Sequence, residues 1–160
     1  MAKQKDPKTN AIRAFDAAKI PHQVHTFPAD TALSGVEVAH LLDEDPDRVF
    51  KTLVTVGKSE EHYVFMVPVA EELDLRKAAC AVGEKSIHMI RSRELLPLTG
   101  YVHGGCSPVG MKKQFTTVID ETAQLFDQII FSAGRIGSQI ECAPSSLESL
   151  VPLIYADITA

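Results

Sequence analysis

The sequence has no tryptophan, three cysteines, and no apolar run that approaches the roughly 20 residues needed to cross a bilayer. Cys80, Cys106 and Cys142 are odd in number and far apart, so they do not indicate a disulfide framework, and no Cys-x-x-Cys pair occurs. A structural zinc site needs four ligands, usually in two close pairs, so His103 with Cys106 does not predict one. We therefore expect no metal. Residues 1–7 lack the apolar core of a secretory signal, which makes a cytoplasmic location the default expectation.

An excess of positive charge is also missing, since the formal net charge is −5. This balance argues against a protein that coats nucleic acid non-specifically, because such proteins are normally basic. A local basic face made by Lys51, Lys112, Lys113 and Arg135 remains compatible with the acidic total. The 160 residues, 45% of them hydrophobic, predict one globular domain over residues 1–160.

Hydrophobic periodicity and capping residues predict a mixed order of helices and strands. The predicted helices cover residues 7–19 (capped by Asp6), 35–43, 75–82, 91–98 (broken by Pro97), 121–126 and 144–150. The predicted strands cover residues 22–27, 49–56, 62–69, 87–90, 115–120, 128–132, 138–143 and 153–158. Hairpins alternate with helices without strict βαβ repetition. This order predicts a mixed α/β fold, a single compact domain with a largely antiparallel sheet surrounded by helices.

Residues 100–113 (Gly-Tyr-Val-His-Gly-Gly-Cys-Ser-Pro-Val-Gly-Met-Lys-Lys) stand out between an apolar segment and a β-rich tail. Gly104 and Gly105 permit backbone conformations that a Cβ would forbid, and they let another molecule approach the main chain. The Ser107-Pro108 pair predicts a turn. The segment is thus interpreted as a rigid binding loop whose backbone N–H groups point outward as donors.

Lys51 interrupts the most apolar strand of the chain, residues 49–56. Such a lysine either reaches solvent from an edge strand or works as a cation on a phosphate or carbonyl oxygen, and the pattern leaves both readings open. Cys106 suggests a nucleophile with His103 as its base, but a thiolate nucleophile also needs an orienting third group that the sequence does not offer. A small side chain that fills space behind the loop is the favoured reading of Cys106.

Three segments together resemble the YbaK/EbsC group of aminoacyl-tRNA deacylases, which belongs to the editing domains associated with prolyl-tRNA synthetase. They are residues 49–53 (Val-Phe-Lys-Thr-Leu), the loop 100–113, and residues 131–137 (Phe-Ser-Ala-Gly-x-x-Gly). The resemblance covers nearly the whole chain in the same order. The loop motif is specific to this group, whereas Phe-Lys-Thr is shared across the superfamily.

The resemblance implies a free-standing editing enzyme that removes cysteine from Cys-tRNA(Pro), with Cys-tRNA(Cys) as a second candidate substrate. It implies no metal and no cofactor, binding of the aminoacylated 3′ end of tRNA, action together with prolyl-tRNA synthetase, and no membrane. By resemblance Lys51 and Gly104 are the catalytic residues, Lys51 at the phosphate or ester end and Gly104 orienting the aminoacyl carbonyl. The expected substrate-binding residues are Phe27, Ser34, Gly105, Ser107, Pro108, Ser132, Gly134 and Gln139.

Three of these residues depart from the family pattern, in which position 27 is often Tyr, position 34 aromatic and position 139 acidic. Those departures affect the details of the substrate pocket and do not affect the resemblance to the family. In the mechanism that the resemblance implies, the substrate's own thiol attacks its ester carbonyl, so no protein nucleophile is needed. Three alternatives stay open: a non-catalytic module that binds aminoacyl-tRNA or nucleotides, an alanine-directed editing enzyme of the same superfamily, and a hydrolase that uses Cys106.

Overall fold

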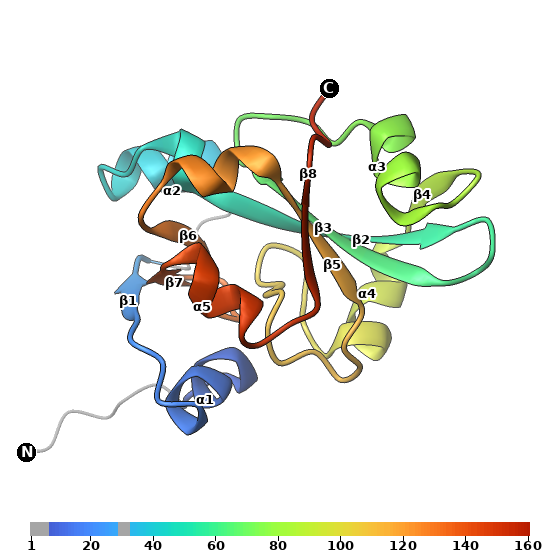
Figure 1. The fold of residues 1–160 in the computed structure, drawn as a ribbon. Helices are drawn as coiled ribbons and strands as arrows, with labels where there is room; N and C mark the ends of the chain where they lie inside the picture. Colours follow the sequence, from blue (N-terminus) through green and yellow to red (C-terminus); the bar gives the residue numbers. More distant parts are fainter. Residues whose placement is uncertain (1–6, 29–32) are drawn as a thin grey trace, which may run out of the picture.

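Two β-sheets lie side by side and helices cover them, in a computed structural model that describes residues 7–28 and 33–160 (Figure 1). Sheet pairing is antiparallel in four of the strand pairs and parallel in two. The predicted mixed α/β domain with a largely antiparallel arrangement is therefore confirmed. No helix of the described residues is long and apolar enough to span a bilayer.

The larger sheet has five strands in the order β4-β2-β3-β5-β8. Their bounds are Ile87–Met89, Phe50–Gly57, His62–Pro68, Thr116–Asp120 and Leu153–Ala156. β2 and β3 form a hairpin whose register runs from Phe50 opposite Pro68 to Val56 opposite His62. β5 then adds parallel to β3, and β8 parallel to β5. The apolar run that predicted the strand 49–56 thus becomes an interior strand.

The smaller sheet has three antiparallel strands in the order β1-β7-β6. They span Gln23–Thr26, Ser138–Cys142 and Ile129–Ser132. One isolated parallel bridge, Val49 to Ile130, joins this sheet to the start of β2. β1, β6 and β7 lie on one side of the molecule, and β4 lies with α3 on the other (Figure 1). The space between the two sheets is where the candidate site forms.

Local sequence signals explain most helix boundaries. The five α-helices, α1 to α5, span Asn10–Ala17, Gly35–Leu41, Leu75–Val82, Ser92–Thr99 and Pro144–Glu148, and two 3₁₀ turns span Pro46–Arg48 (η1) and Glu121–Leu125 (η2). In α2 a capping box is present, since Glu37 N donates to Ser34 Oγ at 3.2 Å and Ser34 N to Glu37 Oε1 at 2.9 Å. In α3 the Asp74 side chain caps the start, and Gly83 ends the helix in the left-handed region.

Two residues predicted to start or break a helix do not do so, and the predicted helices 7–19, 35–43 and 144–150 are shorter in the structure. Thr9, not Asp6, caps α1, because its side chain accepts from Ile12 N at 3.1 Å; Asp6 itself lies outside the described residues. Pro97 was expected to break its helix, yet α4 continues through it to Thr99. The Thr99 hydroxyl donates to Leu95 O at 2.8 Å and so satisfies a carbonyl of the last turn.

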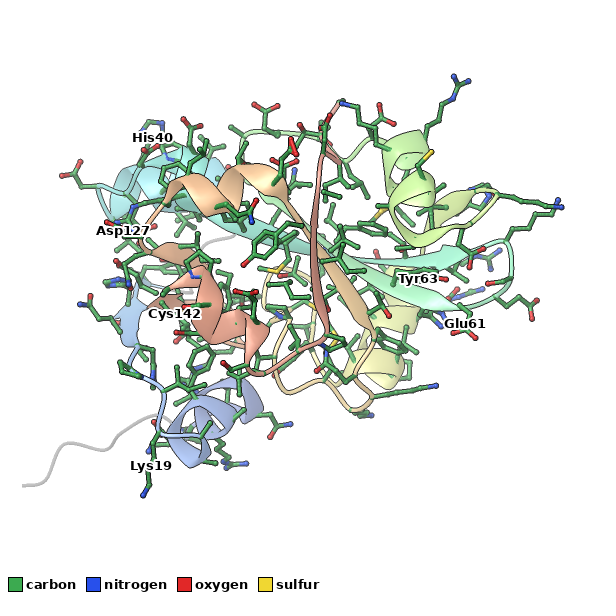
Figure 2. The ribbon with its side chains drawn as sticks, viewed as in Figure 1. Lys19, His40, Glu61, Tyr63, Asp127 and Cys142 are labelled. Carbon is green, nitrogen blue, oxygen red and sulfur yellow. The ribbon has the colours of Figure 1, made fainter. Side chains whose placement is uncertain are left out.

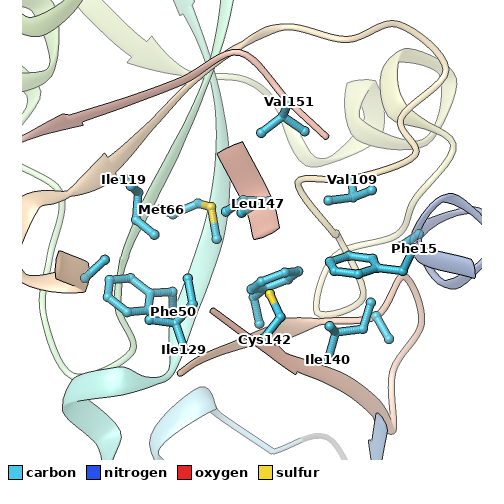
Figure 3. Packing of buried hydrophobic residues seen from close by; sticks show 14 of the residues in the cluster. Phe15, Phe50, Met66, Val109, Ile119, Ile129, Ile140, Cys142, Leu147 and Val151 are labelled. Atoms are coloured by element: carbon cyan, nitrogen blue, oxygen red, sulfur yellow. The ribbon is translucent and has the colours of Figure 1, made fainter. Parts of the chain in front are cut away.

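The main core lies between the two sheets and α1 and α5 (Figure 3). Phe15 from α1, Phe131 from β6 and Met66 from β3 are fully buried in it. Each such side chain stabilises the fold by about 1.5–3 kcal/mol relative to exposure. Charged side chains such as Lys19 and Glu61 point outward, whereas Cys142 lies within the fold (Figure 2). The core holds the two sheets at fixed positions around the site.

Candidate active site

A cavity of about 660 Å³ opens where the two sheets meet. β4 pairs only with Thr55–Gly57 of β2, and the bridge to Ile130 starts at Val49. Between these two points no described strand pairs with the side of β2 that lies away from β3. Residues 49–54 line the cavity. Val54 O already accepts from Ile90 N at 3.4 Å, so the backbone groups available to a ligand on this edge lie before Val54.

Six of the ten predicted site residues line this cavity, although they come from separate segments. They are Phe27 after β1, Ser34 at the cap of α2, Lys51 in β2, Gly104 in the loop, Ser132 in β6 and Gln139 in β7. The Ser34 hydroxyl already accepts from the helix, and the Ser132 hydroxyl accepts from Gly134 N at 3.1 Å. Each hydroxyl still has a proton to donate.

Lys51 brings a cation to the cavity wall. Its ammonium nitrogen lies 3.8 Å from Glu72 Oε1, and the two side chains are 31% and 85% exposed. An ion pair this exposed contributes little, so Glu72 does not hold the ammonium group away from a ligand. Lys51 lines the cavity with a side chain that is 31% exposed, a place from which the ammonium group reaches both solvent and a bound ligand.

The loop 100–113 is folded around the Tyr101 ring. Tyr101 is 5% exposed, and its hydroxyl donates to Val109 O at 2.6 Å. Burial raises the pKa of this phenol to about 12. A Cβ on Gly110 would lie 2.8 Å from the Tyr101 hydroxyl, and a Cβ on Gly134 would lie 2.8 Å from Cε1 of the ring. The motif glycines at these two positions thus make room for the tyrosine.

The remaining four predicted substrate-binding residues do not line the cavity. Gly105 packs against the backbone of Arg135, Gly134 packs against Tyr101, and Ser107 and Pro108 are buried within the loop. These residues shape the loop from behind. The expected outward direction of the loop donors is also only partly right, because Gly105 N donates to Val102 O, Val109 N to Ser107 Oγ and Lys112 N to Thr99 O.

Gly104 is exposed at the cavity and has a φ of +84°. That left-handed conformation favours glycine. Its N–H donates to none of the residues that the structure describes. Gly104 therefore has a backbone N–H at the cavity wall without an acceptor among the described residues, and the family resemblance assigns this residue to the aminoacyl carbonyl.

Cys106 lines the cavity, but it is 7% exposed. Burial raises the pKa of its thiol to about 12, so the thiol is neutral at physiological pH. His103, the base considered for it, is exposed. A neutral, packed thiol is a poor nucleophile, as the sequence-based reading of Cys106 expects.

Two further cavity residues, Thr52 and Ser138, are not among the site residues predicted from the sequence. The hydroxyl oxygens of Thr52 and Ser138 are buried at the cavity, and neither has a hydrogen-bond partner within residues 7–28 and 33–160. A buried hydroxyl without a partner costs about 1–3 kcal/mol, which makes both groups candidates to bind a ligand. Thr52 belongs to the Phe-Lys-Thr motif, whereas the only sequence signal for Ser138 is that it adjoins Gln139.

The expected basic face forms in part. Lys51 and Arg135 line the cavity, and Arg91 joins them from the start of α4. Lys113 lies instead 5.9 Å from the centre of the Phe115 ring. Among the described residues, no three potential metal ligands gather. The cavity thus combines cations and neutral polar groups on an otherwise apolar wall.

Comparisons with known proteins point in one direction. The sequence model of the family described as "Aminoacyl-tRNA editing domain" matches residues 29–150. An Enterococcus faecalis protein named "Putative Cys-tRNA(Pro)/Cys-tRNA(Cys) deacylase EbsC" is 45% identical over 161 residues, which cover 99% of this chain and 98% of that protein.

Two solved structures share the fold over nearly their whole length. One, described as a "putative trans-editing enzyme for prolyl tRNA synthetase", has a TM-score of 0.82 at 25% identity, covering 97% of this chain and 99% of that chain. Another, of a hypothetical protein, has a TM-score of 0.85 at 20% identity, with 95% and 100% covered.

Proposed function

The chain belongs to the aminoacyl-tRNA editing domain family, of the YbaK/EbsC type, and from this premise we propose that it is an aminoacyl-tRNA deacylase. Its substrates are tRNAs that carry cysteine: Cys-tRNA(Pro) first, and Cys-tRNA(Cys) as in the name of the Enterococcus relative. The observation that carries the proposal is the meeting of Lys51, Gly104 and Ser132 at one cavity from three separate segments.

The reaction needs no nucleophile from the protein. The substrate's thiol sulfur attacks the ester carbonyl carbon, a C–S bond forms, and the C–O bond to the ribose breaks. The thiol proton passes to the ribose oxygen, and the products are a cyclic thiolactone and free tRNA. The buried, neutral Cys106 supports this route, because the cavity wall offers no ionised thiol of its own.

Positioning and charge stabilisation then supply the rate enhancement. The Gly104 N–H donates to the carbonyl oxygen as negative charge develops there. The Lys51 ammonium group acts on the same charge or on the terminal phosphate. A single donor of this kind contributes about 10²–10³ in rate. Once a substrate fills the cavity, the apolar wall around these two groups lowers the local dielectric constant and strengthens both interactions.

Release of labelled amino acid from Cys-tRNA(Pro), Ser-tRNA(Pro) and Ala-tRNA(Pro) tests the proposal. Serine replaces the thiol by a hydroxyl of similar size, and alanine removes it. We expect rapid release of cysteine alone, at least 100-fold slower release with Lys51→Ala, and unchanged release with Lys58→Ala, an exposed lysine of the β2–β3 hairpin. If tRNA binds but no ester is cleaved, the chain is a binding module and the proposal fails.

Cys106→Ala separates substrate-assisted cleavage from a protein thiol. We expect this variant to keep most of its deacylase activity, because the sulfur that attacks belongs to the substrate. A loss of several orders of magnitude, with the fold intact by circular dichroism, would instead make Cys106 the nucleophile.

Prolyl-tRNA synthetase is the proposed partner. The net charge of −5 gives the chain little affinity of its own for tRNA, so a synthetase bound to the same tRNA would help to retain the substrate. Addition of the synthetase at a tRNA concentration below KM should then raise the rate. An unchanged rate over a range of synthetase concentrations would remove this partner.

A further inference from the structure

Gln139 holds a side chain with two different ends at the cavity wall. The residue is 7% exposed and lies in β7, where it pairs with His25 of β1 on one side and Ser132 of β6 on the other. With its amide oriented to suit the surrounding hydrogen bonds, the Gln139 nitrogen donates to both carboxylate oxygens of Glu44, at 3.2 and 2.8 Å. Glu44 itself does not line the cavity.

This contact decides which way the amide faces. A carboxamide has a donor end and an acceptor end, whereas an ionised carboxylate only accepts. If the Gln139 amide rotated by half a turn, its oxygen would face the Glu44 oxygens and the hydrogen bonds would be lost. Glu44 therefore fixes the nitrogen on its own side and leaves the carbonyl oxygen as the acceptor end.

Glu44 is itself held among charged groups. Burial raises the pKa of Glu44, while the charges of His25 and Arg48 and the hydrogen bond from Gln139 oppose that rise. The Glu141 carboxylate is nearby and adds to the rise, but it is paired with His25 Nε2 at 2.6 Å and with Arg48 Nη1 at 3.2 Å. The amide and the carboxylate thus stabilise one another.

We propose that Glu44 is a positioning residue, which holds the Gln139 carbonyl oxygen as the acceptor for the α-ammonium group of the aminoacyl ester. This rests on the proposed function, because an aminoacyl-tRNA brings one cationic donor group into the cavity, beside its ester. A neutral amide oxygen of fixed direction binds such a group and leaves the ester carbonyl to Gly104 and Lys51. A hydrogen bond to a charged group contributes about 10- to 100-fold in binding.

The experiment compares Cys-tRNA(Pro) with N-acetyl-Cys-tRNA(Pro), which has no α-ammonium group. For the wild type we expect kcat/KM to be about 10- to 100-fold lower on the acetylated substrate. Gln139→Leu should lose a similar factor on Cys-tRNA(Pro) and little on the acetylated form. Glu44→Gln, which keeps the size but allows the amide to turn, should raise KM for Cys-tRNA(Pro) about 3- to 10-fold with kcat nearly unchanged.

A charge exchange gives the sharpest readout. Gln139→Glu alone places two carboxylates against each other and should lower activity further than Glu44→Gln does. The double variant Gln139→Glu/Glu44→Gln restores one carboxylate and one amide in contact, with an acceptor still at the cavity, and should recover activity on Cys-tRNA(Pro). The matched control is Glu71→Gln, which removes an exposed carboxylate elsewhere in the chain. Its kcat/KM should equal the wild-type value on both substrates.

Equal losses on both substrates in Gln139→Leu, or no recovery in the double variant, would overturn the assignment of Glu44 and Gln139. Thermal unfolding of each variant shows whether the fold is retained, and Glu44→Gln supplies the conservative case. If the wild type cleaves neither substrate, the proposed function fails separately. The affinity of wild type and Gln139→Leu for the two tRNAs then decides the inference, which requires a preference for the free amine that the variant lacks.

Discussion

Gly105 packs so closely on a neighbouring turn that replacing it with alanine tests the architecture of the cavity. A Cβ at this position would lie 2.9 Å from Arg135 Cα and from Ile136 N, and 3.0 Å from Arg135 C. All three are backbone atoms, which cannot rotate away, so the loop and the turn must separate by several tenths of an ångström. Overpacking of this kind lowers the free energy of unfolding by about 1–3 kcal/mol. For a chain of this size the melting temperature falls by roughly 2–4 °C per kcal/mol.

Activity should fall further than stability does. Gly104, Arg135 and Ile136 all line the cavity, so a displacement between loop and turn moves the Gly104 N–H relative to the substrate. A misplacement of about 1 Å lowers the rate by about 100-fold. We therefore expect Gly105→Ala to lose roughly 10- to 100-fold in kcat/KM on Cys-tRNA(Pro) while it remains folded.

Gly83→Ala is the control, because it places a side chain at a positive φ without a steric clash against neighbouring atoms. Gly83 has a φ of +74°, and a Cβ there would meet no atom of residues 7–28 and 33–160 within 4 Å. It should lose about 1–2 kcal/mol of stability and no deacylase activity. Thermal unfolding and deacylation measured on the same preparations give both quantities. Wild-type melting and wild-type turnover in Gly105→Ala would refute the close packing of loop and turn.

The remaining predictions concern the buried thiols and one hydroxyl. Iodoacetamide should modify exposed Cys80 in the native protein and buried Cys106 and Cys142 only on unfolding, as mass spectrometry can detect; native labelling of all three at one rate would contradict their burial. Burial raises the pKa of Cys106 and Cys142 from 9.0 to about 12, so between these values only the unfolded state ionises. Denaturant titrations should therefore show stability falling by up to about 1.4 kcal/mol per pH unit for each thiol above pH 9, with a shallower slope in Cys106→Ala/Cys142→Ala. Ser138→Ala removes a hydroxyl that has no partner among the described residues, so its unfolding free energy should stay equal or rise while kcat/KM falls; a clear loss of stability would reveal a partner for the hydroxyl.

Elements with complete local signals are predictable from the sequence. The helix over 75–82 begins after a capping Asp74 and stops at Gly83, and the structure has it at the same residues. The strand over 49–56 is recognisable because a short run of apolar and β-branched residues between turn signals is typical of a buried strand. Lys51 and Gly104 were selected by motif, and the fold brings both to one cavity.

Features set by distant partners are not predictable in this way. A pair of glycines indicates a tight loop, but only the fold shows that Gly105 packs on Arg135 and does not face a ligand. Thr9 caps its helix while its hydroxyl also donates to Ala133 O, far along the chain. Similarly, the sequence does not indicate a role for Glu44, because only the fold shows that β7 places Gln139 beside it.

The division into two sheets belongs to the same class. Each strand is visible in the sequence, but nothing local says that β2 pairs with β4 at one end and bridges to Ile130 at the other. The cavity forms beside the stretch of β2 that lies between these two pairings. The two hydroxyls that lack a partner in the described part of the chain, and the backbone edge without a strand partner there, could therefore not be predicted from the strands one by one.

The segment after β8 has a consequence for the order of events during synthesis. Ile158 O accepts from Asp74 N, and Ala160 N donates to Glu72 O, so these late residues fasten the stretch that carries the ion-pair partner of Lys51. A ribosome reaches Ala160 roughly 110 positions after Lys51, which takes roughly 5 to 20 s at the usual pace of translation. A nascent chain therefore displays Lys51, the proposed catalytic lysine, well before the surrounding wall can close, and a truncated product would carry the motif without a finished pocket.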